Sequence, residues 1–476
     1  MSLTTIILAA GKSTRMLSLK SKILFKISAE PIIQHVYNAA KKIKSNNIVC
    51  VLSNPPDELT KFIKDNKIQS ALQLNPSGTA DAVKSALKKI PNKPKNKILI
   101  LCGDVPFISA KSLNIMIKKL NLSDLCLGTF NQDNPSGYGR VIREDNKIIK
   151  IIEEKDATEK IKKIKEINTG IICVNEGILR KYISKIKNNN KQKEFYLTDL
   201  ISLLSDNNHK ISSYCIKEEL ETMGINSKKD LVDLERKLLV KKATDLLNKG
   251  VLIRDVQRTD IKGVLKVQKD VEIDINCIFE DKVSIGSSTT IGHNCYLNRC
   301  KIGKNVHIKP NTIIFGATIG DNCIVGPYAR IRPGAILKNN SQVGNFVEVK
   351  NSTIGSGTKV NHLSYIGDAT LGSNINVGAG CITCNYDGEK KHKTIIESDS
   401  FIGSGTRLVA PVTVAKGSYI AAGSTVTKDT PGDGSLTIAR SKQVSIPKWK
   451  NKTIKGKNNV WDFWRSVVYG CSKRFN

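Results

Sequence analysis

Residues 283–303 read VSIGSSTTIGHNCYLNRCKIG, in which an aliphatic residue followed by Gly returns about every sixth position. A period of six fits neither a helix nor a flat strand. It is typical of a parallel β-helix, in which each flat side of a coil points one aliphatic residue inward and turns at a small residue. The pattern goes on to about residue 430, through Ile319-Gly320, Val325-Gly326, Val343-Gly344, Ile354-Gly355, Ile366-Gly367, Leu371-Gly372, Val377-Gly378 and Ile402-Gly403. We therefore predict a β-helix over about a third of the chain.

The length and composition place the rest of the chain. A chain of 476 residues is too long for one core, and its 40% hydrophobic content is enough to bury two or three. We find no apolar run long enough to cross a membrane and no signal peptide, and the twelve Cys follow no disulfide pattern. We therefore expect a cytoplasmic protein with reduced thiols and no membrane insertion. Cys381 and Cys384 form one CxxC, which we interpret as part of the β-helix wall.

The formal net charge of +32 raises the question of a nucleic-acid partner. The excess is mostly Lys spread over the whole chain, without aromatic interleaving or a binding motif. We interpret it as solvated surface that helps to gather phosphorylated substrates, and we expect no nucleic-acid binding.

The chain divides into four predicted segments. Residues 1–226 alternate strands (4–9, 48–52, 98–102) with helices such as 31–45, which indicates an α/β domain with a mostly parallel, Rossmann-like sheet. Residues 227–250 predict a linking helix that ends at Gly250, in the C′ position. Residues 251–445 form the β-helix, and the tail 446–476 has no role that we can assign. The linking helix aligns Leu231, Leu234, Leu238, Leu239, Leu246 and Leu247, and the tail holds Trp449, Trp461, Phe463 and Trp464.

The loop after the first strand has the composition of a phosphate site. Residues 8–16 read LAAGKSTRM, so that Gly11 allows backbone N–H groups to approach a phosphate while Lys12 and Arg15 supply charge. The spacing is not that of a P-loop. Asp104 follows a buried strand, where a carboxylate can hold Mg²⁺ against a triphosphate. Taken alone, Asp104 could equally cap the next helix.

Polar residues interrupt the aliphatic wall of the β-helix between residues 330 and 440. Spacing by about one coil brings Arg332 and Lys350 to nearly the same edge, with His362 and Tyr365 close by. Glu348 lies about one coil from His362, and we expect it to orient the imidazole.

With these motifs the chain resembles the GlmU family, bifunctional N-acetylglucosamine-1-phosphate uridylyltransferases and glucosamine-1-phosphate N-acetyltransferases, from about Thr4 to Arg440. The family pattern L-A-A-G-x-G-T-R-M is present with Ser13 in place of the second Gly. The pattern P-K-x-L is present as residues 21–24, with Ser21 in place of Pro and with Lys22 kept.

For the N-terminal domain, the resemblance implies uridylyl transfer from UTP to N-acetylglucosamine-1-phosphate with release of pyrophosphate. Arg15 and Lys22 would be catalytic, and Asp104 and Asn226 would bind Mg²⁺. The residues implied to bind UTP or UDP-N-acetylglucosamine are Leu8, Ala9, Gly11, Lys22, Gln73, Gly78, Thr79, Gly139, Glu153, Asn168, Thr169 and Asn226. Of these, Gln73, Gly78 and Thr79 would hold the uracil, and Gly139, Glu153, Asn168 and Thr169 would face the sugar phosphate.

For the C-terminal domain, the resemblance implies acetyl transfer from acetyl-CoA to glucosamine-1-phosphate, with His362 as general base. Arg332, Lys350, Tyr365 and Asn376 would bind the sugar phosphate. Ala379, Asn385, Tyr386, Ser404, Ala422 and Arg440 would contact acetyl-CoA. The two activities together would make UDP-N-acetylglucosamine for peptidoglycan and lipopolysaccharide precursors. The resemblance also implies a left-handed coil and a homotrimer with sites between subunits.

Two other readings compete with this one. A sugar nucleotidyltransferase of the ADP-glucose pyrophosphorylase type also joins such a domain to a short β-helix, but the longer repeat array, His362, Tyr365 and Asn385-Tyr386 argue against it. A scaffold without activity, or a basic RNA-binding protein, is disfavoured because Arg15, Lys22, Asp104, Asn226 and His362 are all retained.

Overall fold

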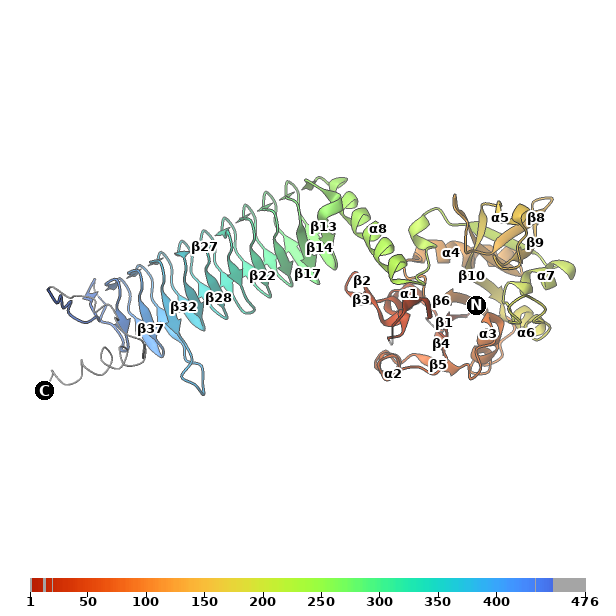
Figure 1. Ribbon diagram of the computed structural model, residues 1–476, viewed down its shortest axis with the longest axis horizontal. Coiled ribbons are helices and arrows are strands. Elements are labelled where there is room, and N and C mark those ends of the chain that lie inside the picture. Colours follow the sequence, from red (N-terminus) through yellow and green to blue (C-terminus); the bar gives the residue numbers. More distant parts are fainter. Residues whose placement is uncertain (1, 12–13, 19, 433, 448–476) are drawn as a thin grey trace, which may run out of the picture.

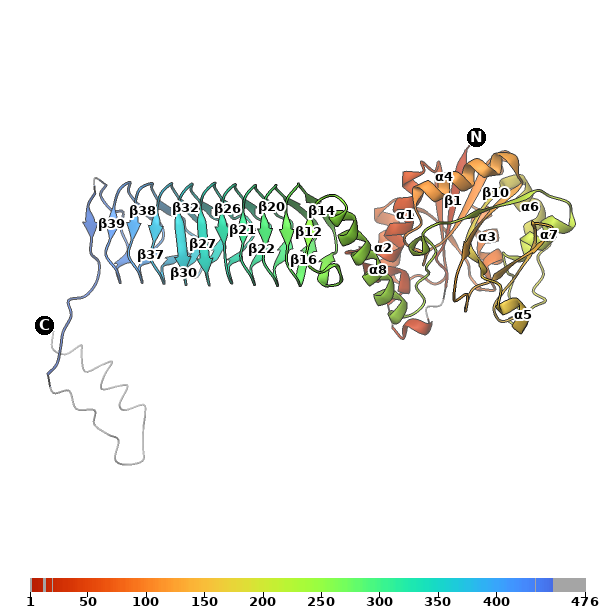
Figure 2. The ribbon, with the colours of Figure 1, turned by 90° about the horizontal axis from the view of Figure 1, so that it is seen from above.

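A computed structural model describes residues 2–11, 14–18, 20–432 and 434–447, as a rounded α/β domain, one long helix and a straight prism (Figures 1 and 2). The aromatic residues of the predicted tail lie outside this part of the chain. Within the described ranges, no helix combines the length and the apolar character that crossing a bilayer requires.

The N-terminal domain is built on one nine-stranded sheet, as the alternation of strands and helices predicts. Its strand order is β11-β7-β10-β6-β1-β4-β5, and the β8–β9 hairpin joins at β10. Strands β1, β4, β5 and β6 run parallel, whereas β10 runs antiparallel to both β6 and β7. The strands are β1 Leu3–Leu8, β4 Asn47–Leu52, β5 Gln69–Leu72, β6 Lys97–Cys102, β7 Leu125–Asn131, β8 Arg140–Glu144, β9 Lys147–Ile152, β10 Glu166–Asn175 and β11 Ile211–Cys215.

Helices cover both faces of this sheet because its central strands are apolar on both sides. In β1, Ile6 packs into a core with the helices α3, α6 and α7, and Ile7 packs into a second core with α1, α2 and α4. The helices are α1 Ile32–Lys42, α2 Asp57–Asp65, α3 Thr79–Leu87, α4 Ala110–Lys119, α5 Glu159–Lys162, α6 Glu176–Ile183 and α7 Asp199–Asp206; a small hairpin, β2 Lys26–Ile27 and β3 Glu30–Pro31, precedes α1.

Helix α8 (Lys228–Leu247) connects the domain to the prism. It begins at a capping box between Ser227 and Asp230. At its end, Gly250 has φ +85° and donates to Leu247 O at 3.0 Å, while the N–H of Val251 donates to Leu246 O at 3.2 Å. This pair of bonds is a Schellman closure, and it puts Gly250 at the C′ position that the sequence predicts.

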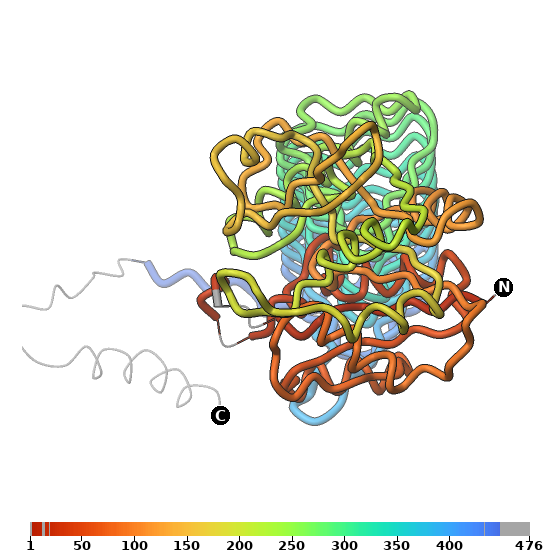
Figure 3. Tube along the Cα trace, turned by 90° about the vertical axis from the view of Figure 1, so that its right-hand side faces the viewer, coloured from red at the N-terminus to blue at the C-terminus, as the bar shows by residue number. Residues whose placement is uncertain are grey.

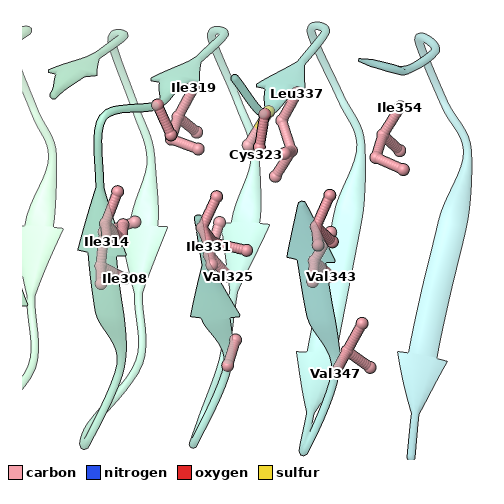
Figure 4. Close-up of a cluster of buried hydrophobic side chains, with 14 of the residues drawn as sticks. Ile308, Ile314, Ile319, Cys323, Val325, Ile331, Leu337, Val343, Val347 and Ile354 are labelled. Atoms are coloured by element: carbon pink, nitrogen blue, oxygen red, sulfur yellow. The ribbon is translucent and has the colours of Figure 1, made fainter. Parts of the chain in front are cut away.

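The prism is the predicted left-handed parallel β-helix, running from β12 (Leu252–Ile253) to β41 (Leu436–Thr437). Its three flat sides are parallel sheets of 11, 10 and 9 strands. Partners on adjacent coils mostly lie 17 or 18 positions apart, as in Thr290–His307 and Glu272–Thr290, but 20 apart in Leu252–Glu272 and 25 apart where a loop is inserted, as in Asn376–Phe401. Seen end-on, successive coils superpose (Figure 3). The inward aliphatic residues form one continuous core, part of which Figure 4 shows around Ile314 and Ile331.

The glycines of the repeat have a different purpose from the one predicted. Gly286 does not form the corner: a Cβ on it would lie 2.5 Å from the carbonyl carbon of Gly303 on the next coil. The corner itself is made two residues later, where Ser288 and Asn305 have φ of +58° and +53°. The glycine after the aliphatic residue is therefore needed because the coils approach closely, and the left-handed corner residue is most often Asn or another Gly.

Candidate active sites

A cavity of about 390 Å³ opens at the carboxyl ends of β1 and β6 in the N-terminal domain. Its walls include Leu8, Ala9 and Gly11 of the first loop together with Gln73, Gly78 and Thr79, and Lys22 and Asp104 also line it. Eight residues that the resemblance assigns to nucleotide or metal binding are thus brought around one cavity. This is the edge of a parallel sheet at which ligands bind in α/β folds.

Lys22 joins the two residues that are predicted to bind Mg²⁺. Its ammonium group forms an ion pair with Asp104 and donates to Asn226 Oδ1 at 3.2 Å. The main chain supports the pairing, because the N–H of Ile225 donates to Asp104 O at 2.9 Å. Asp104 does not cap the next helix, since Ser109 caps α4. The side-chain oxygen atoms of Asp104 and Asn226 thus meet around one ammonium group. Oxygen atoms are the donors that a hard divalent cation prefers.

The predicted uracil side of the cavity is held rigidly. The Gln73 side chain is buried, and its Nε2 donates to Gly78 O at 3.1 Å and to Asp81 Oδ2 at 2.8 Å. Gly78 has φ +127°, and a Cβ there would collide with the backbone of Phe195. Thr79 Oγ1 accepts from the N–H of Leu197 at 2.9 Å. With its amide nitrogen engaged, Gln73 presents its carbonyl oxygen as the remaining hydrogen-bonding group.

The predicted sugar-binding residues gather where the β8–β9 hairpin meets β10. The N–H of Asn168 donates to Gly139 O at 2.8 Å, and a Cβ on Gly139 would lie 3.2 Å from Glu153 Oε2. Glu153 Oε1 accepts from the Thr198 hydroxyl at 2.9 Å. Burial, together with the charges of Asp199 and Asp156, raises the pKa of Glu153. Thr169 is buried and donates to Gly128 O at 2.8 Å, so that its role in this structure is to support the strand.

Three further observations complete this site. Arg15 lies in a short 3-10 helix, Thr14–Met16, and its side chain is exposed. Of two residues without a predicted role, Cys102 lines the cavity and Tyr138 lies beside Gly224, close to the predicted ligand Asn226. Burial raises the pKa of Cys102, which lines the cavity, to about 12. Tyr138 bonds to the backbone of Gly224, and burial raises its pKa. Neither residue carries a sequence signal, because only the fold brings it near the cavity.

In the β-helix, His362 lies at the end of β30 (Lys359–His362), paired with Asn345 of β27 (Gln342–Asn345). The imidazole Nδ1 is 2.9 Å from Asn345 Oδ1. The prediction that Glu348 orients the imidazole is wrong for this structure. Glu348 contacts Arg332 at 2.6 Å and Arg330 at 3.6 Å, because a carboxylate forms strong charge-assisted hydrogen bonds with guanidinium groups.

The predicted sugar-phosphate residues Arg332, Lys350 and Tyr365 share one flat side with Glu348. Lys350 ends β28 (Glu348–Lys350) and is paired with Gly367 of β31 (Tyr365–Gly367). A Cβ on Gly367 would collide with the Tyr365 hydroxyl, so the phenol ring lies across this glycine.

Sequence reasoning missed Lys391. The neighbouring Lys350 ammonium group lowers the pKa of Lys391, which shows that the two cations lie side by side. Burial raises the pKa of Asp368, but hydrogen bonds from Asn351 and Asn385, together with these lysines, lower it overall. Lys391 stands in a loop with no repeat pattern, so periodicity could not have placed it beside Lys350.

One corner of the prism carries most of the predicted acetyl-CoA contacts. Gly380 N–H donates to His362 O, Gly405 N–H to Ala379 O and Gly423 N–H to Ser404 O, so the residues stack coil upon coil. Arg440 closes the series by donating to Ala422 O at 2.8 Å. His362 therefore stands at one end of an edge formed by Ala379, Ser404, Ala422 and Arg440.

Asn385 and Tyr386 lie away from this edge. Asn376 lies on a different flat side of the prism from Lys350 and Tyr365. The loop between β34 (Ile382–Cys384) and β35 (Thr394–Ile396) follows the sheet that holds Tyr365, leaves that sheet at the end away from His362 and projects from the prism (Figure 1). Asn376 begins β33 (Asn376–Val377), next to Lys359 on the sheet of His362. One chain thus presents the predicted acetyl-CoA residues at two separate corners.

Comparison with known proteins agrees with both halves of the fold. The nucleotidyl transferase family matches residues 4–222, the GMPPB C-terminal domain matches residues 261–343, and the hexapeptide repeat of succinyl-transferase matches residues 393–428. A crystal structure from Bacillus anthracis, of a candidate glucose-1-phosphate thymidylyltransferase with a sucrose, covers 49% of the chain and 94% of its own, at 16% identity and a TM-score of 0.41, which is too distant to carry an argument.

Similarity to curated relatives covers nearly the whole chain. Three proteins named bifunctional protein GlmU come from Pseudoalteromonas atlantica (41% identity over 95% of this chain and 99% of the relative), Herminiimonas arsenicoxydans (41%, 94% and 98%) and Marinobacter nauticus (40%, 94% and 98%). The chain belongs to the GlmU family. As a GlmU protein it is a bifunctional enzyme of UDP-N-acetylglucosamine synthesis, with acetyltransferase and uridylyltransferase activity, which confirms the activities predicted from the sequence.

Proposed function

We propose that the cavity at the ends of β1 and β6 performs uridylyl transfer with Mg²⁺, and that the corner at His362 performs acetyl transfer. The observation that carries the first assignment is the meeting of Asp104 and Asn226 at the Lys22 ammonium group. The second rests on the exposed His362, which begins an edge of small residues ending at Arg440.

Asp104 and Asn226 fit a magnesium ion that is shared with substrate phosphates, since Mg²⁺ in such sites takes only one or two protein ligands. The bound ion would neutralise charge on the triphosphate of UTP. Lys22 and Arg15 add positive charge from the protein, which lowers the repulsion between the incoming sugar phosphate and the α-phosphate. Gln73 would hold the uracil ring through its carbonyl oxygen, and Glu153 and Asn168 would position the sugar.

For acetyl transfer, the Asn345 amide oxygen would accept a hydrogen bond from the Nδ1–H of His362, which leaves Nε2 with a free lone pair. Nε2 would take a proton from the amine of glucosamine-1-phosphate as the nitrogen attacks the thioester carbonyl and CoA leaves. Arg332, Lys350 and Lys391 would hold the phosphate. Arg440, at the far end of the edge, would pair with the phosphates of acetyl-CoA.

We propose that the enzyme works as a homotrimer. Tyr328, Phe346 and Leu363 form an apolar ridge on the His362 corner, with side chains 52%, 57% and 62% exposed. All three have positive φ, which is costly for bulky residues, and the first two rings stack at 5.2 Å. A neighbouring prism would cover the ridge and bring its own Asn385 and Tyr386 to the His362 edge. The enzyme would act in the cytoplasm and supply UDP-N-acetylglucosamine to envelope precursors.

The decisive experiment measures both half-reactions on the same preparations. With glucosamine-1-phosphate, acetyl-CoA, UTP and Mg²⁺, the protein should release CoA and pyrophosphate and form UDP-N-acetylglucosamine. His362→Ala should lower acetyl transfer by roughly 10²–10⁴-fold and leave uridylyl transfer intact. Asp104→Ala, or a metal chelator, should do the reverse. If His362→Ala kept most of its acetyltransferase rate, the assignment of the base would be wrong.

A further inference from the structure

One large cavity belongs to neither active site. It has a volume of about 990 Å³ and lies at the junction between the N-terminal domain and the first coils of the prism. Figure 1 shows the β2–β3 hairpin and α1 next to this end of the prism. We call it the junction cavity; its lining residues used below are His35, Lys42, Phe107, Leu238, Lys242, Val264, Lys282 and Arg299.

The polar wall of the junction cavity carries an excess of positive charge. Lys42 on α1 and Lys282 on β17 (Lys282–Ile285) are exposed, and neither forms a side-chain hydrogen bond or ion pair within the described part of the chain. Glu30 and Asp281 also line the cavity, but Asn38 donates to Glu30 at 3.2 Å and Arg299 lies 3.7 Å from Asp281. The two uncommitted cations therefore come from different domains and face one space.

The other wall is apolar and partly aromatic. Val264, on β14 (Val264–Val267), is 55% exposed although it is aliphatic, and it faces Leu238 and Phe107 across the cavity. The His35 ring stands edge-on to Phe107 at 5.1 Å, and burial lowers its pKa, which favours the neutral imidazole. A site with an apolar wall and a few charged groups is the usual form of a small-molecule site.

The two domains meet through Lys242 beside this cavity. Its ammonium group donates to Ser28 Oγ at 2.6 Å in the N-terminal domain and to Ile261 O at 2.9 Å in the first coil. A ligand in the junction cavity would therefore touch both domains where they are already held together.

The cavity walls are also connected to the proposed magnesium ligands. Phe107 lies in the same loop as Asp104, three positions later. Leu238 and Lys242 lie on α8, whose N-cap Ser227 directly follows Asn226. A molecule that moves this loop against α8 would change the separation of Asp104 and Asn226.

We propose that the junction cavity binds a small organic anion, made of an apolar or aromatic body and one anionic head group, and that its occupancy alters uridylyl transfer. The head group pairs with Lys42 and Lys282, and the body packs between Val264, Leu238 and Phe107. The first part of this proposal concerns binding alone and stands apart from the assignments under Proposed function. Its second part rests on the proposed roles of Asp104 and Asn226.

The test uses 8-anilinonaphthalene-1-sulfonate, a fluorescent aromatic anion, with the full chain in saturating UDP-N-acetylglucosamine and CoA. One saturable site per chain should remain. Phenyl phosphate should displace the probe at least tenfold more effectively than phenol. Lys42→Glu/Lys282→Glu and Val264→Asp should each weaken probe binding at least tenfold, and these exposed positions should not affect folding. The matched control Lys64→Glu/Lys301→Glu reverses two exposed lysines outside the cavity and should bind the probe as the unchanged protein does.

The absence of a saturable site, or equal binding by the junction variants and the control, would overturn the proposed site. The probe should also change the uridylyl-transfer rate at least twofold without changing acetyl transfer. Binding without that change would overturn the coupling and leave the site standing. Because binding is read by fluorescence, failure of the proposed active-site assignments would not affect this outcome.

Discussion

Nδ1 of His362 lies 2.9 Å from Oδ1 of Asn345, its partner on the preceding coil. Both residues come from the same position of the repeat, so the stacking of the coils sets the orientation of the imidazole. The acidic neighbour Glu348 is instead held by two guanidinium groups. The proposed base is thus oriented by a neutral amide, and this has a direct kinetic consequence.

Asn345→Leu removes the acceptor, so that the imidazole can adopt either tautomer and rotate. We expect acetyl-transfer kcat to fall about tenfold, the equivalent of one hydrogen bond of about 1.4 kcal/mol. Asn345→Asp keeps an acceptor and should restore most of the rate, with the acidic limb of the pH profile moved upward because a carboxylate raises the pKa of imidazole. Uridylyl transfer on the same samples is the control, and an unchanged acetyl-transfer rate in Asn345→Leu would contradict the prediction.

The projecting loop is held in shape by Asp387. Its carboxylate accepts from the backbone N–H of Glu389 and Lys390 and from His392 Nε2, at 2.8, 2.6 and 2.6 Å, and these donors hold the pKa of Asp387 far below its usual range. We expect Asp387→Ala to loosen the loop and to raise the KM for acetyl-CoA about tenfold with less effect on kcat. Glu389→Ala, in the same loop, is the matched control, and equal kinetics for the two variants would contradict a role for Asp387.

Glu153 gives a prediction about pH. Burial, and after it the like charges of Asp199 and Asp156, raises its pKa in the folded chain above the ordinary value of 4.5. Its contribution to stability is therefore present below pH 4.5 and is lost as the pH rises through the raised pKa. Glu153→Gln stays neutral, so its urea midpoint should exceed that of the unchanged protein at pH 7, and the difference should vanish near pH 4. A difference that is constant with pH would exclude this account.

Ser21 stands where the family pattern has Pro, and its backbone already suits that residue. Its φ is −58°, within the range that a proline ring imposes, and its N–H makes no hydrogen bond in the described part of the chain. Ser21→Pro should raise the free energy of unfolding of the N-terminal domain by about 0.4–1 kcal/mol through the unfolded state. Urea unfolding with a domain-specific probe measures this, and destabilisation would show that the loop conformation differs.

Periodicity predicted the β-helix because its physical cause is local: every coil buries the same kind of residue. The sequence also predicted the ends of the strands at Leu8 and Cys102, and these ends correctly placed Asp104 at the carboxyl edge of the sheet. The sequence also showed the glycine after each inward aliphatic residue, but it did not show why a glycine is required there. The close approach of Gly286 to Gly303 is a contact between coils, which the spacing along one coil cannot reveal.

The parts that could not be predicted depend on competition between side chains. Glu348 is about one coil from His362, as the spacing indicated, yet its carboxylate pairs with Arg332 and not with the imidazole. Lys391 reaches Lys350 only because its loop folds back, with Tyr386 bridged to Lys391. Asn226 reaches Lys22 and Asp104 across the domain, and only the family resemblance connected these positions beforehand.

The corner that carries Ala379, Ser404, Ala422 and Arg440 advances by one coil at each step, which corresponds to roughly 4.8 Å. The number of coils between His362 and each of these residues therefore sets the distance between them. Coils could be added or removed below residue 300 without changing the distances along this edge. One coil inserted between His362 and Arg440 would move the terminal guanidinium away by a full strand spacing. If acetyl-CoA binds along this edge as proposed, the number of coils is free to vary before His362 and is fixed by the length of the substrate after it.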